Sequence, residues 1–71
     1  VELGDAANGD LAFFSNSSGR IIHVGILMVE DGETRIIHAS GKVRIDRLDK
    51  VGIYNEDTAS YSHQLHHLQR I

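Results

Sequence analysis

An Asp-Gly pair lies between two apolar, β-branched runs and predicts a tight β-hairpin. The runs are IIHVGILMV, residues 21–29, and TRIIHA, residues 34–39, and the segment EDGE, residues 30–33, joins them. Asp-Gly is favoured in two-residue hairpin turns because both positions need positive φ. The first run is short and is interrupted by Gly25, which favours a strand over a helix.

The turn also fixes which residues of the hairpin face each other. With Asp31 and Gly32 as the loop, the predicted pairs are Glu30 with Glu33, Met28 with Arg35, Gly25 with His38, and His23 with Ser40. Side chains alternate between faces along a strand, and cross-strand partners share a face, so His23 and His38 lie on the same face as diagonal neighbours. Their Cβ atoms are expected about 7–8 Å apart or less, and Gly25 leaves room for a ring or a third group between them.

Other segments of strand length follow the same pattern of apolar runs separated by turn residues. LAFF, residues 11–14, and KVRID, residues 42–46, are predicted strands, and Phe13 and Phe14 must point to opposite faces. The segment 47–62 has no clear period and is predicted to be a loop. HQLHHLQRI, residues 63–71, suits either a helix with Leu65, Leu68 and Ile71 on one face or a strand. The sum is four to five antiparallel strands and no convincing helix.

A sheet of this size needs a layer that covers its apolar face. The chain has 71 residues and begins at Val1 without an initiator Met or a signal sequence. We therefore expect the chain to be internal to a longer product, whose missing segment carries the covering layer.

Composition excludes several classes of function. The net charge is −3 and the seven Lys and Arg residues are scattered, so nucleic acid is not an expected partner. No apolar run approaches the roughly 18 residues of a membrane span, so no transmembrane segment is expected. The chain has no cysteine and therefore no disulfide, no cysteine-type zinc site and no thiol nucleophile.

Three further features of the sequence could suggest function, but each lacks the rest of the motif or has a structural role. His63, His66 and His67 would share one face of a helix, as in a zinc site, but the glutamate of the zinc-peptidase motif is missing. Ser40 is predicted opposite His23, yet no nucleophile-elbow motif surrounds it. Asp10 follows a predicted turn, where Asp commonly accepts hydrogen bonds from nearby backbone, so we assign it a structural role.

Three segments together resemble a known family of enzymes. GDLAFF at residues 9–14, RIIHVGI at 20–26 and IIHASGKVRID at 36–46 occur in the order found in the C-terminal half of the NlpC-type (NlpC and p-sixty) cell-wall cysteine peptidases, which are papain-like. The resemblance covers residues 9–45 and extends loosely to the closing segment LQRI. In that family the nucleophilic cysteine lies upstream, at the start of a helix.

The resemblance implies an α+β, papain-like fold in which residues 1–71 supply the antiparallel β-sheet part of a single domain. The N-terminal helical half, with the nucleophile, is absent from this chain. His23 matches the family's general base and His38 matches the residue that orients it. No metal or other cofactor is implied.

The substrate that the resemblance implies is the peptide stem of bacterial peptidoglycan, cut between D-glutamate and diaminopimelate or lysine. The site of action is then the cell envelope, with the protein secreted or periplasmic. On its own the chain lacks the cysteine and should be inactive. The alternative is a non-catalytic module of the same fold that binds the cell wall or a protein partner.

Overall fold

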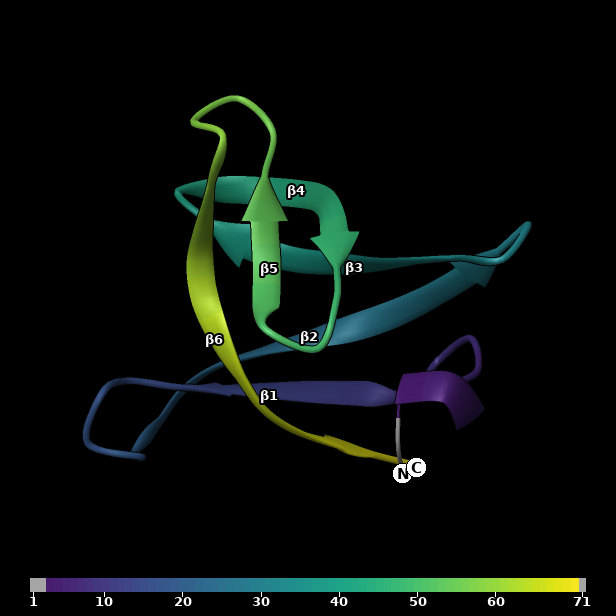
Figure 1. Cartoon of the computed structure of the whole chain (residues 1–71), viewed down its shortest axis with the longest axis horizontal. Helices are drawn as coiled ribbons and strands as arrows, with labels where there is room; N and C mark the ends of the chain where they lie inside the picture. The colour runs from purple at the N-terminus through teal and green to yellow at the C-terminus, as the bar shows by residue number, and fades with distance from the viewer. Residues whose placement is uncertain (1–2, 71) are drawn as a thin grey trace.

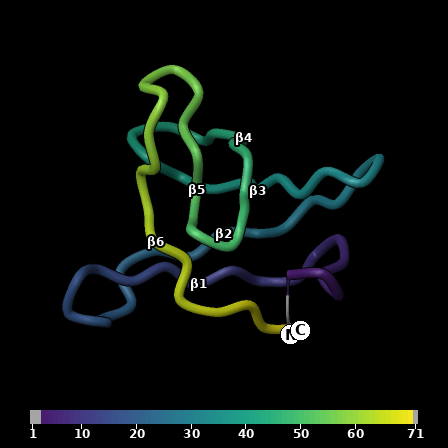
Figure 2. Tube along the Cα trace, viewed as in Figure 1, coloured from purple at the N-terminus to yellow at the C-terminus, as the bar shows by residue number. Residues whose placement is uncertain are grey.

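The computed structural model describes residues 3–70, which form a closed barrel of six antiparallel strands in sequential order (Figure 1). A short 3₁₀ helix, η1, precedes the barrel, and β1 pairs with both β2 and β6 to close it. The β2–β3 hairpin reaches beyond the rest of the barrel (Figure 2). The elements are η1 (Leu3–Asp5), β1 (Leu11–Ser15), β2 (Ile21–Glu30), β3 (Glu33–Ser40), β4 (Lys42–Leu48), β5 (Gly52–Asn55) and β6 (Ser60–Gln69).

The antiparallel arrangement is confirmed, but the predicted number of four to five strands is wrong. The segment 47–62, predicted as a loop, contains the end of β4, the whole of β5 and the start of β6. A strand of four residues, such as β5, is too short to show a period in the sequence. The chain 3–70 contains no α-helix, and residues 63–69 are strand. Val1 was used to predict that the chain is internal to a longer product, and Ile71 was placed on the apolar face of a possible helix. Both residues lie outside the described part of the chain.

Closure of the barrel corrects the prediction that a separate layer must cover the apolar face of the sheet. The inward side chains of the strands pack against each other, so the sheet buries its own inner face. Five of these side chains are fully buried. The core consists of Ala12, Phe14, Leu27, Ile36, Leu48, Ile53 and Leu68. No second layer is needed to form this core.

The predicted hairpin and its register are confirmed over the described ladder. Asp31 and Gly32 have φ of 51° and 79°, as the two-residue turn requires. The pairs run from Glu30 with Glu33 to Ile26 with Ile37. Because the ladder ends there, the predicted pairs of Gly25 with His38 and of His23 with Ser40 are not among its pairs.

The space beside Gly25 holds an aliphatic side chain, which corrects the prediction of room for a ring. A Cβ atom at Gly25 would lie 2.5 Å from Ile36 Cδ1 and 3.0 Å from the Ile37 carbonyl oxygen. Ile36 is fully buried. Glycine at this position therefore allows the core to pack tightly below the histidines.

Three irregularities in the pairing of residues 3–70 reset the alternation of side chains. The β1–β2 ladder passes from Phe14–His23 to Ser15–Ile21 and leaves Ile22 without a partner in that ladder. The β5–β6 ladder skips Ser62, and the β1–β6 ladder skips His66. Such bulges let a strand keep apolar residues inside although its sequence breaks the period of two.

Polar contacts tie the ends of the barrel together. Asp10 is buried, its Oδ2 accepts a hydrogen bond from the backbone N–H of Ala7, and Arg70 donates to both of its carboxylate oxygens. The Arg70 side chain also donates to the carbonyl of Asp5. These contacts agree with the structural role assigned to Asp10. Within residues 3–70, no helix has the length and apolar character that a membrane crossing requires.

Candidate functional site

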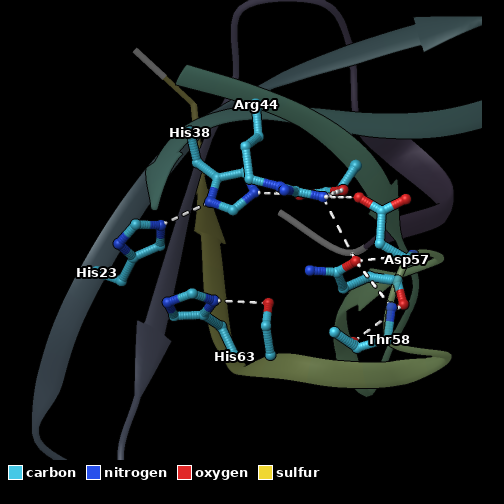
Figure 3. A network of polar contacts seen from close by, with 9 residues as sticks. His23, His38, Arg44, Asp57, Thr58 and His63 are labelled. Atoms are coloured by element: carbon cyan, nitrogen blue, oxygen red, sulfur yellow. Dashed lines mark hydrogen bonds and ion pairs between the residues drawn. The ribbon is translucent and has the colours of Figure 1, made fainter. Parts of the chain in front are cut away.

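Three histidines from three strands converge at one end of the barrel interior (Figure 3). His23 lies near the start of β2, His38 near the end of β3, and His63 in β6. His23 Nε2 and His38 Nδ1 are 2.9 Å apart, within hydrogen-bond distance. The ring of His63 stacks on that of His23, with centroids 4.1 Å apart and planes 19° apart. The convergence of His23 and His38 that the register implied is therefore present.

The strands position each histidine against the apolar core. His23 pairs with Phe14 of β1, and the two ring centroids are 5.8 Å apart. His63 pairs with the fully buried Ile53 of β5. His38 is two positions from Ile36 on β3, and its side chain is only 1% exposed. His38 is thus the deepest of the three, and His23 and His63 are half-buried.

A buried carboxylate holds the far side of His38. His38 Nε2 lies 2.7 Å from Asp46 Oδ2, and the Asp46 side chain is 8% exposed. Arg44 donates from Nε to Asp46 Oδ2 at 3.0 Å and from Nη2 to Oδ1 at 3.2 Å. The Arg44 hydrogen bonds are the largest cause that lowers the pKa of Asp46 below its ordinary value, with the bond from His38 also contributing. The carboxylate therefore stays ionised at neutral pH.

The ionised carboxylate determines the proton positions on the two neighbouring rings. Asp46 can only accept, so His38 Nε2–H donates to it and neutral His38 keeps its lone pair on Nδ1. His23 Nε2–H must then donate to His38 Nδ1. In the neutral state this leaves the lone pair of His23 on Nδ1, which is the tautomer that a general base facing away from His38 requires.

Burial keeps two of the rings neutral. The pKa of His23 is lowered, first by burial and then by the positive charges that His63 and His38 would carry. The pKa of His63 is lowered by burial and by His38, against an opposing effect of Asp46. At neutral pH both rings therefore offer lone pairs, as a base or a metal ligand must.

Sequence reasoning missed Asp46, Arg44 and the place of His63 in this cluster. The signal for the first two was present: alternation in KVRID places Arg44 and Asp46 on one face, and the β3–β4 hairpin pairs His38 with Arg44. Arg44 Nη2 reaches further, to Asp57 Oδ2 at 3.1 Å and to Asn55 Oδ1 at 3.4 Å. This network anchors the β4 side of the site to the β5–β6 turn (Figure 3).

The three histidines of the HQLHH segment do not form one cluster, because the segment is a strand and His66 is skipped in the pairing. His66 and His67 are exposed and contact each other through their Nδ1 atoms at 2.7 Å. His67 also stacks on Phe13, whereas Phe14 is buried, as predicted for this pair of phenylalanines. Ser40 is exposed and pairs with Lys42.

Comparison with known proteins gives one finding. The model of the NlpC/P60 family matches residues 1–67 of the chain. No curated protein and no solved structure matches it. The family match includes all three clustered histidines and Asp46. Because it spans nearly the whole sequence, the chain belongs to the NlpC/P60 family, a family of cysteine peptidases that act on the cell wall.

Proposed function

We propose that this chain supplies the general base His23 and its orienting residue His38 to a cysteine peptidase that hydrolyses peptidoglycan stem peptides. The supporting observation is the hydrogen-bonded series His23–His38–Asp46, with distances of 2.9 Å and 2.7 Å. A base, an orienting group and a buried carboxylate in series are what an activated nucleophile needs. The chain has no cysteine, so the thiol comes from sequence outside these 71 residues.

In this mechanism His23 Nδ1 accepts the proton of the thiol, and the thiolate attacks the carbonyl carbon of the scissile amide. The resulting imidazolium returns its proton to the leaving amine, which releases the first product and leaves an acyl-enzyme. Water then attacks the thioester, with His23 again as base, and regenerates the thiol. Through each step His23 Nε2–H keeps its hydrogen bond to His38, which fixes the plane of the ring.

The outer surface of the barrel supports a larger domain. Ile26, Ile37 and Ile45 are neighbours across β2, β3 and β4, and Ile26 and Ile45 are about half exposed. Val24 and Val43 extend the same apolar surface. Contiguous exposed apolar side chains mark surfaces that another segment covers. We assign this surface to a helical N-terminal half of a papain-like domain, of which residues 1–71 are the C-terminal part.

Family membership supports the proposed scissile bond and the proposed site of action. The proposed bond lies between D-glutamate and diaminopimelate or lysine, and the proposed site is the bacterial cell envelope, with the protein secreted or periplasmic.

The test is to express the protein together with the coding sequence upstream of Val1 and to incubate it with muropeptides. We expect cleavage of the stem peptide by mass spectrometry, and loss of turnover in His23→Ala. His66→Ala is the matched control, because His66 is an exposed histidine outside the cluster. Full turnover in His23→Ala, or a thiol-independent activity, would contradict the proposal.

The absence of cysteine favours a second candidate, a non-catalytic module that binds the cell wall or a partner. The intact mass of the native product distinguishes the two. A mass near the 7.9 kDa of the chain, with retention on purified sacculi that His23→Ala does not alter, favours the module. A larger product with a reactive cysteine favours the peptidase.

A further inference from the structure

Beyond the peptidase role, we propose that His23, His38 and His63 form a zinc-binding site. One ring nitrogen from each residue lies within 4.8 Å of the others. Three imidazoles with an open fourth position are a known ligand set for Zn²⁺. The residues come from β2, β3 and β6, so the barrel itself, and not a flexible loop, brings the ligands together.

The second nitrogens of two rings already have the partners that zinc-binding histidines require. His38 Nε2 donates to Asp46, which leaves Nδ1 for a metal and matches the carboxylate–histidine–zinc arrangement. His63 Nδ1 lies 2.9 Å from Ser62 Oγ, which leaves Nε2 available. Such outer partners fix the ring orientation and raise the basicity of the ligating nitrogen. This arrangement distinguishes the cluster from a chance group of surface histidines.

Two of the ligand atoms already have nearly the right spacing. Tetrahedral Zn–N bonds of about 2.0–2.1 Å place ligand nitrogens about 3.3 Å apart. His23 Nε2 and His38 Nδ1 are 2.9 Å apart, so the ion is admitted when the two nitrogens separate slightly and both rings rotate to direct their lone pairs at it. His63 must approach more closely and turn out of its stack on His23. His63 is half-buried, so part of its ring already faces solvent.

Metal binding and base catalysis exclude each other at His23. A zinc ion on Nε2 takes the position of the proton that His23 donates to His38, and that proton moves to Nδ1 of the same neutral ring. Nδ1 then has no lone pair to accept a thiol proton. The metal-loaded site is therefore an inactive form of the proposed peptidase.

The test measures Zn²⁺ affinity by competition with a chromophoric chelator, using the 71-residue chain and three variants. We expect one tight site in the chain and in the double variant His66→Gln/His67→Gln, which removes the exposed histidine pair. His63→Gln should weaken binding by a factor of about 10 or more, and Asp46→Asn by about 10–100-fold through His38. Tight binding that disappears in the double variant but persists in His63→Gln would overturn the proposal.

A measurement on the unaltered chain removes any dependence on the folding of variants. In ¹⁵N spectra of the histidine rings, Zn²⁺ should shift the signals of His23, His38 and His63 and leave those of His66 and His67 in place. Shifts confined to His66 and His67, or no shift at stoichiometric Zn²⁺, would also overturn it. Neither experiment needs the thiol, so a failure here leaves the proposed peptidase function untouched, and a failure of peptidase activity leaves the metal site untouched.

Discussion

His38 and Asp46 form the innermost polar contact of the histidine cluster, with Nε2 and Oδ2 2.7 Å apart and both side chains buried. This one contact fixes the tautomer of His38 and, through it, that of His23. The charge of Asp46 is balanced by Arg44, which binds both carboxylate oxygens. The chemistry at the exposed edge of the cluster therefore depends on a residue that is itself buried.

Replacing this carboxylate should destabilise the fold. In Asp46→Ala the buried His38 Nε2–H loses its acceptor, while Arg44 keeps Asp57 and Asn55. We expect the free energy of unfolding to fall by about 1–3 kcal/mol, the cost of leaving a buried donor unsatisfied. Asp57→Ala is the control, because Asp57 also binds Arg44 but is exposed, and its effect should be below about 1 kcal/mol. Urea denaturation of both variants is the measurement. Equal losses of unfolding free energy in the two variants would show that burial of Asp46 adds nothing to stability.

Stability should decrease when the pH falls below the ordinary histidine pKa of about 6.5. The pKa values of His23 and His63 are lowered in the folded protein, so the unfolded chain binds protons more readily in this range. Stability then rises with pH between the lowered pKa values and about 6.5, and levels off above that. Thermal unfolding between about pH 5 and pH 8 checks this. His63→Gln should flatten the dependence, whereas a flat profile for the unaltered chain would refute the prediction.

Gly25→Ala should strain the core beneath the histidines. The new Cβ would lie 2.5 Å from Ile36 Cδ1, and we expect a loss of about 1–3 kcal/mol in the free energy of unfolding. Ile36→Val removes Cδ1 and should recover part of the loss in the double variant, which a double-mutant cycle measures. Gly4→Ala is the control, since nothing lies within 4 Å of the position that its new methyl group would occupy. Strictly additive effects of the two core substitutions would contradict the contact.

Gly52→Ala should separate β5 from β6 beside His63. A Cβ at this position would overlap the backbone carbonyl oxygen of His63, and a backbone atom cannot move away without shifting the strand. We expect a loss of about 3 kcal/mol or more and a changed ring environment for His63. Denaturant unfolding and the histidine NMR signals report the two effects. Val51→Ala, at the exposed neighbouring position, should leave both nearly unchanged.

The sequence was informative where local chemistry determines the structure. Asp31 and Gly32 specify the turn, and the turn specifies the register from Glu30–Glu33 to Ile26–Ile37. Extended beyond this ladder, the register predicted His23 and His38 on one face, and their ring nitrogens are in contact. It was uninformative about β5 and β6, because β5 is short and two bulges interrupt the period of β6. His63 was consequently grouped with its sequence neighbours His66 and His67, although the fold groups it with residues far away along the chain.

The bulges make the site sensitive to chain length at some positions and indifferent to it at others. An insertion at the tip of the β2–β3 hairpin, beyond Glu30, extends a surface turn and leaves the histidines in place. Ser62 is the residue that the β5–β6 ladder skips, and its deletion leaves His63 opposite Ile53 and Tyr61 opposite Tyr54, so each side chain keeps its face of the sheet. Among homologous sequences, a gap at Gln64, which pairs with Gly52 and with Ser15, should thus accompany loss of the His63 position, whereas gaps at Ser62 or at the hairpin tip should be neutral.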